Sequence, residues 1–247
     1  MITATFAQID TAIWAYLAPK NRDAARLSVA NAAQSLLDGA SAGSDNQLQY
    51  AKAFANNAVN PEQFDRLKAM LNGSVSGLVI DAELRWYLFL CGVKRGIFGV
   101  ADIAAEGERD KTAHGKQYIA FAHAAIPTHE AKAAAFKSIT TDDLSNTIHA
   151  YTCRGFNESI HGDLLEAFVE DYFAAILEVW KNKGFEIAET TATLAFPTWA
   201  ISESTVTKTK HWLDVTGKDA SHALRRSVTE GRDAMTRALK ARAVDAR

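Results

Sequence analysis

The sequence predicts an all-α protein, an α-superhelix or solenoid of antiparallel helix pairs similar to HEAT and armadillo arrays. Strong helix formers dominate the composition, alternating β-branched stretches are few, and there are only 4 prolines in 247 residues. Helix start and stop signals recur so closely that only short turns separate about twelve or thirteen expected helices. Short turns make consecutive helices run antiparallel. We expect a single helical domain over residues 1–247.

The helix start signals are side chains that cap the free N–H groups of a first turn. Ser44 and Gln47 have the S-x-x-Q spacing of a capping box. Asn60 precedes Pro61, a proline at the first helical position, and Asn72–Gly73 ends that helix. Further starts are expected at Asp81, Thr128, Ser202 and near Lys218–Asp219, and further ends at Gly39, Gly96 and Pro197. The stretch 39–44, GASAGS, resembles a linker but is too short to mark a domain boundary.

The broadest apolar stripe runs from Asp163 to Lys181, with apolar residues at helical spacing and acidic residues opposite them. This pattern predicts one long central helix. The last helix is expected from about Lys218 to Arg242 and carries several arginines, which are typical of a solvated face or of a contact with an acidic partner.

Composition and charge exclude several classes of protein. Lys and Arg total 27 against 29 for Asp and Glu, and no run of like charges suits nucleic acid or an anionic membrane. No apolar stretch approaches the roughly 18 to 20 residues of a membrane span, and the N-terminus lacks a secretion signal. We therefore expect a cytoplasmic protein. The two cysteines, Cys91 and Cys153, lie in apolar surroundings and are expected to be small buried hydrophobic residues.

The motifs of known catalytic centres are absent. His129-Glu130 begins like the zinc-binding H-E-x-x-H motif, but Ala133 stands where the second histidine is needed. We interpret His129 and Glu130 as first-turn residues of a helix. His114 and His123 are nine residues apart, which places them on nearly opposite helix faces. The sequence indicates no catalytic residue, no metal ligand and no cofactor in this chain.

Five segments, in order, span about two thirds of the chain and are distinctive as a set. The segments are DAELRW from Asp81, ERDKT from Glu108, PTHEAKAAAF from Pro127, YFAAILEVW from Tyr172 and LRRSVTEGRDAMTRALKAR from Leu224. Together they resemble the C-terminal helical domain of bacterial aminopeptidase N, a zinc-dependent family that removes single residues from peptide N-termini.

The resemblance implies a helical domain, similar to that of the endoplasmic-reticulum aminopeptidases, which covers a catalytic domain of the same polypeptide and shapes the chamber that peptides enter. In complete enzymes of this family H-E-x-x-H and the G-x-M-E-N segment lie in the preceding domains, and neither occurs here. We therefore expect this chain to be the C-terminal part of a longer zinc aminopeptidase, with the zinc in the parent's catalytic domain. The expected partners are that domain and a peptide substrate, with no nucleic acid and no membrane.

Cationic and aromatic side chains are the candidates for the wall of such a chamber or for contacts between domains, because cations pair with peptide carboxylates and acidic neighbours. The candidates are Arg85, Trp86, Arg154, Arg225, Arg226 and Arg232. A structural salt bridge is the alternative role for each of them. For the whole chain, one alternative is a stand-alone helical-repeat scaffold that binds a protein on its concave face. The other is a metal enzyme built from scattered His and Asp residues.

Overall fold

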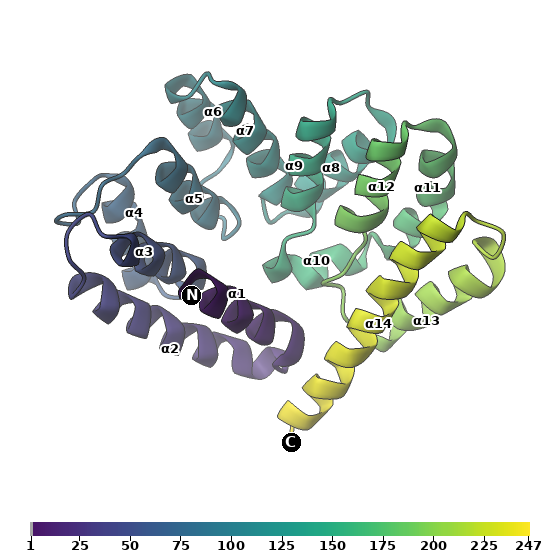
Figure 1. Cartoon of the computed structure of the whole chain (residues 1–247), viewed down its shortest axis with the longest axis horizontal. Coiled ribbons are helices and arrows are strands. Elements are labelled where there is room, and N and C mark those ends of the chain that lie inside the picture. Colours follow the sequence, from purple (N-terminus) through teal and green to yellow (C-terminus); the bar gives the residue numbers. More distant parts are fainter. Residues whose placement is uncertain (1) are drawn as a thin grey trace. The chain divides into compact units, whose positions relative to one another are not determined.

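A computed structural model describes residues 2–247, and this part of the chain holds helices and no strand (Figure 1). The all-α prediction is confirmed, with fourteen α-helices among the described residues where about twelve or thirteen were expected. The α-helices are α1 (Ile2–Thr11), α2 (Pro19–Asp38), α3 (Asp45–Asn57), α4 (Pro61–Leu71), α5 (Ala82–Val93), α6 (Val100–Arg109), α7 (Ala113–Ala125), α8 (His129–Thr141), α9 (Asn146–Phe156), α10 (Gly162–Glu166), α11 (Val169–Asn182), α12 (Phe185–Leu194), α13 (Glu203–His211) and α14 (His222–Asp245). Shorter turns are the π-helical segments η1 (Ala12–Tyr16) and η3 (Trp212–Thr216) and the 3₁₀ turn η2 (Ser159–His161).

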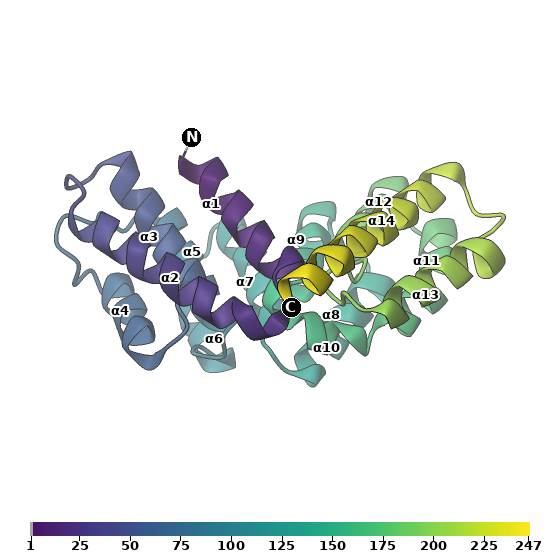
Figure 2. The same ribbon diagram turned by 90° about the horizontal axis from the view of Figure 1, so that it is seen from below.

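The chain divides into two compact units. Unit 1 comprises the described residues up to Gly99 together with Asp245–Arg247, and unit 2 comprises Val100–Val244. The prediction of a single domain and the exact type of solenoid stay predictions. Within unit 1, α2 and α3 lie side by side, and within unit 2 so do α11 and α12 (Figures 1 and 2).

The expected caps start the helices of unit 1. The Ser44 Oγ accepts a hydrogen bond from the Gln47 N–H at 3.2 Å, and the Gln47 side chain accepts one from the Gly43 N–H at 2.8 Å. The capping box is therefore present, with the return bond made one residue earlier than the standard motif. Asn60 and Asp81 likewise accept bonds from N–H groups three residues ahead. Residues 39–44 form the loop between α2 and α3.

Cationic side chains close the other ends of these helices. The Arg95 Nε donates to the carbonyl oxygen of Ala58 at 3.1 Å, and its Nη2 bonds the carbonyl oxygen of Asn56. Arg26 donates to the same Ala58 carbonyl at 2.8 Å. The last carbonyls of a helix have no partner inside it, so these guanidinium groups satisfy acceptors at the end of α3.

The prediction of one long central helix over Asp163 to Lys181 is wrong in one respect. A turn at residues 167 and 168 interrupts the helix. The Phe168 N–H bonds the Leu165 carbonyl oxygen at 3.0 Å, which closes a turn between α10 and α11. The turn places the Phe168 ring among Phe136 and Phe156, with centroid distances of 5.9 and 5.5 Å. Tertiary packing of this aromatic ring therefore outweighs the helical period of the sequence.

The last helix begins at His222, later than the expected Lys218. The segment before it forms η3 and a turn, and the Ser221 Oγ accepts a bond from the Leu224 N–H at 3.3 Å. Arg225 donates to the carbonyl oxygens of Leu213 and Gly217, both at 2.7 Å, and thereby holds the turn in place.

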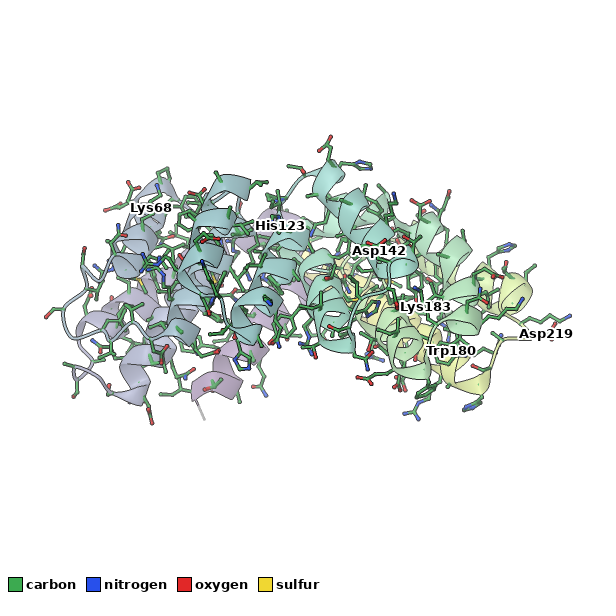
Figure 3. All side chains as sticks on the ribbon, turned by 90° about the horizontal axis from the view of Figure 1, so that it is seen from above. Lys68, His123, Asp142, Trp180, Lys183 and Asp219 are labelled. Carbon is green, nitrogen blue, oxygen red and sulfur yellow. The ribbon has the colours of Figure 1, made fainter. Side chains whose placement is uncertain are left out.

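The core of unit 2 is formed where α8, α9, α11 and α12 meet η3 and α14, and nearly all of its side chains are apolar. The largest fully buried aromatic side chains in this unit are Tyr172, Phe156 and Phe196. At the surface of unit 2, the Lys183 Nζ donates to the carbonyl oxygen of Asp142 at 2.9 Å, just past the end of α8 (Figure 3).

Both cysteines are buried as expected, so they are predicted to resist alkylation. Cys91 is 2% exposed, and burial raises the pKa of Cys153 to about 12. The thiolate is the reactive form, so neither residue is expected to take up iodoacetamide at pH 8 in the native protein, and both to do so in denaturant. Mass spectrometry measures the two states, and fast native labelling of Cys153 would contradict the structure.

Candidate functional site

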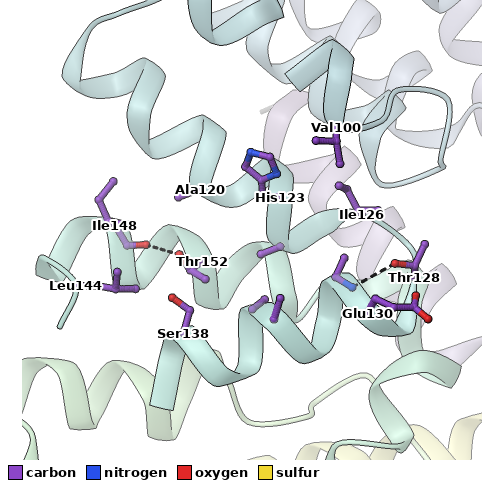
Figure 4. A pocket seen from close by; sticks show the side chains of 14 residues that line it. Val100, Ala120, His123, Ile126, Thr128, Glu130, Ser138, Leu144, Ile148 and Thr152 are labelled. Atoms are coloured by element: carbon purple, nitrogen blue, oxygen red, sulfur yellow. Dashed lines mark hydrogen bonds between the residues drawn. The ribbon is translucent and has the colours of Figure 1, made fainter. Parts of the chain in front are cut away.

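A groove of about 680 Å³ lies in unit 2. Its walls come from α7, α8 and α9, and Val100, the first residue of α6, closes one side (Figure 4). Figure 4 shows Leu144 and Ile148 at one end of the groove and Val100 and Ile126 at the other. The remaining lining residues are Ala120, His123, Ala124, Thr128, Glu130, Ala131, Ala134, Ala135, Ser138 and Thr152. The lining is therefore mostly apolar.

A buried lysine holds the three helices that form this groove. Lys132, on α8, is 0% exposed, and its Nζ donates three hydrogen bonds of 2.8 Å. The acceptors are the carbonyl oxygens of Ala124 at the end of α7 and of Gly155 and Phe156 at the end of α9. Lys132 therefore ties the ends of α7 and α9 to α8 and fixes the width of the groove.

The electrostatics of Lys132 result from opposing effects. Burial lowers the pKa of Lys132 to about 7, and the charge of Glu158 opposes that shift. A neutral amine has only two N–H donors, so three donated bonds correspond to the ammonium form. The C-terminal ends of helices carry partial negative charge, which also favours a cation at this position.

Two of the polar side chains along the groove are bonded to its own backbone. The Thr128 hydroxyl accepts a bond from the Ala131 N–H at 3.2 Å, and the Thr152 hydroxyl donates to the Ile148 carbonyl oxygen at 2.8 Å (Figure 4). Desolvation lowers the pKa of His123, so its imidazole is neutral at pH 7. Glu130 is then the one charged group among the lining residues.

Two of the expected wall residues lie in unit 1 and have structural surroundings. Trp86 is 1% exposed and packs edge to face on Phe89 at 5.8 Å, so its ring is part of the core and cannot touch a peptide. Arg85 donates to the carbonyl oxygen of Leu71, the last residue of α4, at 3.0 Å.

The other four candidates lie in unit 2 and do not converge on the groove. Arg225 holds the turn after η3, as described above. Arg226 pairs with Glu230 at 2.8 Å, and Arg232 pairs with Asp233 at 2.9 Å. Arg154 is exposed and lies over the Tyr151 ring at 5.4 Å. A role of these arginines in a peptide chamber stays a prediction.

The described part of the chain contains no group of three His, Cys, Asp or Glu side chains that would hold a metal ion. His129 begins α8 next to its cap, Thr128, and stacks on Phe168 at 5.2 Å. It is the first-turn residue that the sequence indicated. Among residues 2–247, no helix is long and apolar enough to cross a membrane.

The comparisons with known proteins agree with the helical architecture. The model of the ERAP1-like C-terminal domain matches residues 1–237. The chain belongs to this family. It is also 41% identical to Aminopeptidase N of Streptomyces lividans over 242 residues, which is 97% of this chain and 28% of that protein. The matched part is the C-terminal part of the relative, so the resemblance expected from the sequence is confirmed.

Lys132 is the residue of the site that sequence reasoning missed, although a signal was present. It lies three residues before Ala135 and seven before Ile139, which are both buried on the core side of α8. A lysine in register with apolar residues at this spacing occupies the buried face of a helix. A buried lysine requires hydrogen-bond acceptors, and helix ends supply them.

We predict that Lys132→Met destabilises the chain strongly, because three buried carbonyl groups lose their hydrogen-bond donor. At roughly 1 kcal/mol or more for each unsatisfied group, the free energy of unfolding should fall by about 3 kcal/mol or more. Urea unfolding followed by circular dichroism measures the change. The control is Lys137→Met on the exposed face of the same helix, which should change stability by no more than about 0.5 kcal/mol. Equal stability of the two variants would refute the role of Lys132.

Proposed function

We propose that this chain is the C-terminal domain of a zinc-dependent aminopeptidase, where it covers the active site and shapes the chamber that peptides enter. The observation that supports this proposal is the match of nearly the whole chain to Aminopeptidase N together with the family match over residues 1–237. The catalytic work belongs to the preceding part of the polypeptide, which also holds the zinc ion. We place the enzyme in the cytoplasm.

A helical domain without a reactive centre contributes to catalysis through shape. A wall beside the active site admits extended peptides and excludes folded proteins. Contacts with the peptide far from the scissile bond supply binding energy that is used in the transition state. Movement of such a wall also gates product release. Arg154, Arg226 and Arg232 stay candidates for peptide contacts, because their side chains reach the surface of unit 2.

The first test concerns the chain alone. Purified residues 1–247 should contain less than about 0.1 zinc ion per chain and release no product from an aminoacyl-nitroanilide, since at least three protein ligands are needed for a catalytic zinc. Plasma emission spectrometry and a colorimetric assay measure both quantities. Stoichiometric zinc together with hydrolysis would show that the chain is itself the enzyme.

The second test concerns the complete polypeptide. The full enzyme should hydrolyse a nitroanilide and short peptides but leave a folded protein with the same N-terminal residue intact. A variant that lacks this domain should keep nitroanilide hydrolysis, which shows that it is folded, and lose the discrimination against the folded protein. If the variant is inactive, the separate chain of residues 1–247 is added back. Discrimination that is unchanged without the domain, or activity that the added chain does not restore, would end the proposal.

A further inference from the structure

We propose that the groove formed by α7, α8 and α9 holds an amphipathic helix from the preceding catalytic part of the polypeptide, with a lysine or arginine of that helix next to Glu130. This inference rests on the proposed function, because it requires the aminopeptidase polypeptide to continue beyond this chain. It assigns one surface of the domain to the contact between the domains and removes that surface from the peptide chamber.

The length of the groove suits the binding of a short helix. Its floor follows α8 from Thr128 to Ser138, ten residue steps that extend about 15 Å at the helical rise of about 1.5 Å per residue. The side chains along the middle of this floor are alanines, so a second helix can approach closely, as in packed helix pairs. A length of about 15 Å corresponds to about three helical turns.

The polar groups of the groove favour a helix over an extended peptide. A helix satisfies its backbone N–H and C=O groups internally, whereas an extended segment needs partners from the groove. The hydroxyl groups of Thr128 and Thr152 are already bonded to the backbone of α8 and α9. The remaining polar side chains of the groove, His123, Glu130 and Ser138, are too few for the backbone groups of an extended peptide, and each group left unsatisfied is costly.

The charge of the groove further limits which segments can bind in it. Glu130 is the one charged lining residue, and no lysine or arginine lines the groove. A peptide carboxylate would meet repulsion and no compensating cation, whereas a cationic side chain of the occupant pairs with Glu130. Val100 is 62% exposed at the rim, so the apolar surface is open to water in this chain and would be covered in the complete enzyme.

Cysteine labelling in the complete enzyme tests the proposal. The Ala134→Cys variant places a thiol on an exposed position of the groove, and Ala105→Cys, on an exposed position of α6 outside the lining residues, is the matched control. Cys91 and Cys153 are buried and give little background. Each variant is treated with a maleimide both as the complete enzyme and as residues 1–247, and mass spectrometry locates the label.

We expect the thiol at position 134 to react at least about tenfold more slowly than the one at position 105 in the complete enzyme, and at a similar rate in residues 1–247. Adding Glu130→Lys to Ala134→Cys should raise the labelling rate in the complete enzyme several-fold, because it sets a cation against the cation of the occupant. Adding Glu130→Gln should have a smaller effect.

Four outcomes would overturn the proposal. Equal labelling of both positions in the complete enzyme shows an open groove, and slow labelling in residues 1–247 shows a groove closed by this chain itself. Protection that appears only after a peptide is added assigns the groove to substrate, and protection that grows with protein concentration assigns it to a second copy. The same preparations are also tested for hydrolysis of short peptides and of the folded protein. This assay distinguishes failure of the proposed helix contact from failure of the proposed function.

Discussion

The arrangement of unit 2 depends on one buried ammonium group. Lys132 reaches from α8 to the last carbonyl groups of α7 and α9, three acceptors that no bond inside their own helices satisfies. Removing any one of these helices would leave either a buried cation or buried carbonyl groups without partners, which is costly on both sides. The hydrogen bonds of Lys132 therefore hold the helices that form the walls of the groove. The side chains of α8 that face the groove are small and apolar, and they do not have to supply these bonds.

The same solution recurs at several other helix ends in the described part of the chain. Arg85 bonds the end of α4, Arg95 bonds the end of α3, and Lys183 bonds the carbonyl oxygen that follows α8. Arrays of short helices expose many C-terminal carbonyl groups, and long cationic side chains from a neighbouring helix can reach them. This use accounts for Arg85 and Arg225, two of the cations that the sequence analysis expected at the wall of the chamber.

Local signals made most of the fold predictable, and tertiary contacts account for what was missed. Ser44, Asn60 and Asp81 cap helices by accepting a hydrogen bond from the N–H group three residues ahead. Such a cap can be predicted from four consecutive residues of the sequence. The turn at Phe168 has no such local signal, since it depends on aromatic rings of α8 and α9 that are distant in sequence. The groove was not predicted for the same reason. The family, in contrast, could be identified from short segments whose order alone is distinctive.

The bonds of Lys132 also bear on how the domain is synthesised. Their acceptors lie 8 residues before the lysine and 23 and 24 residues after it, all within neighbouring helices. Contacts of such short range favour rapid folding. During translation, however, the amine has only one of its three acceptors until Gly155 and Phe156 have left the ribosome, so its bonds to α9 cannot form before then. The synthesis of α9 completes this group of three helices. A pause in translation before that point would prolong the time during which α7 and α8 exist without α9.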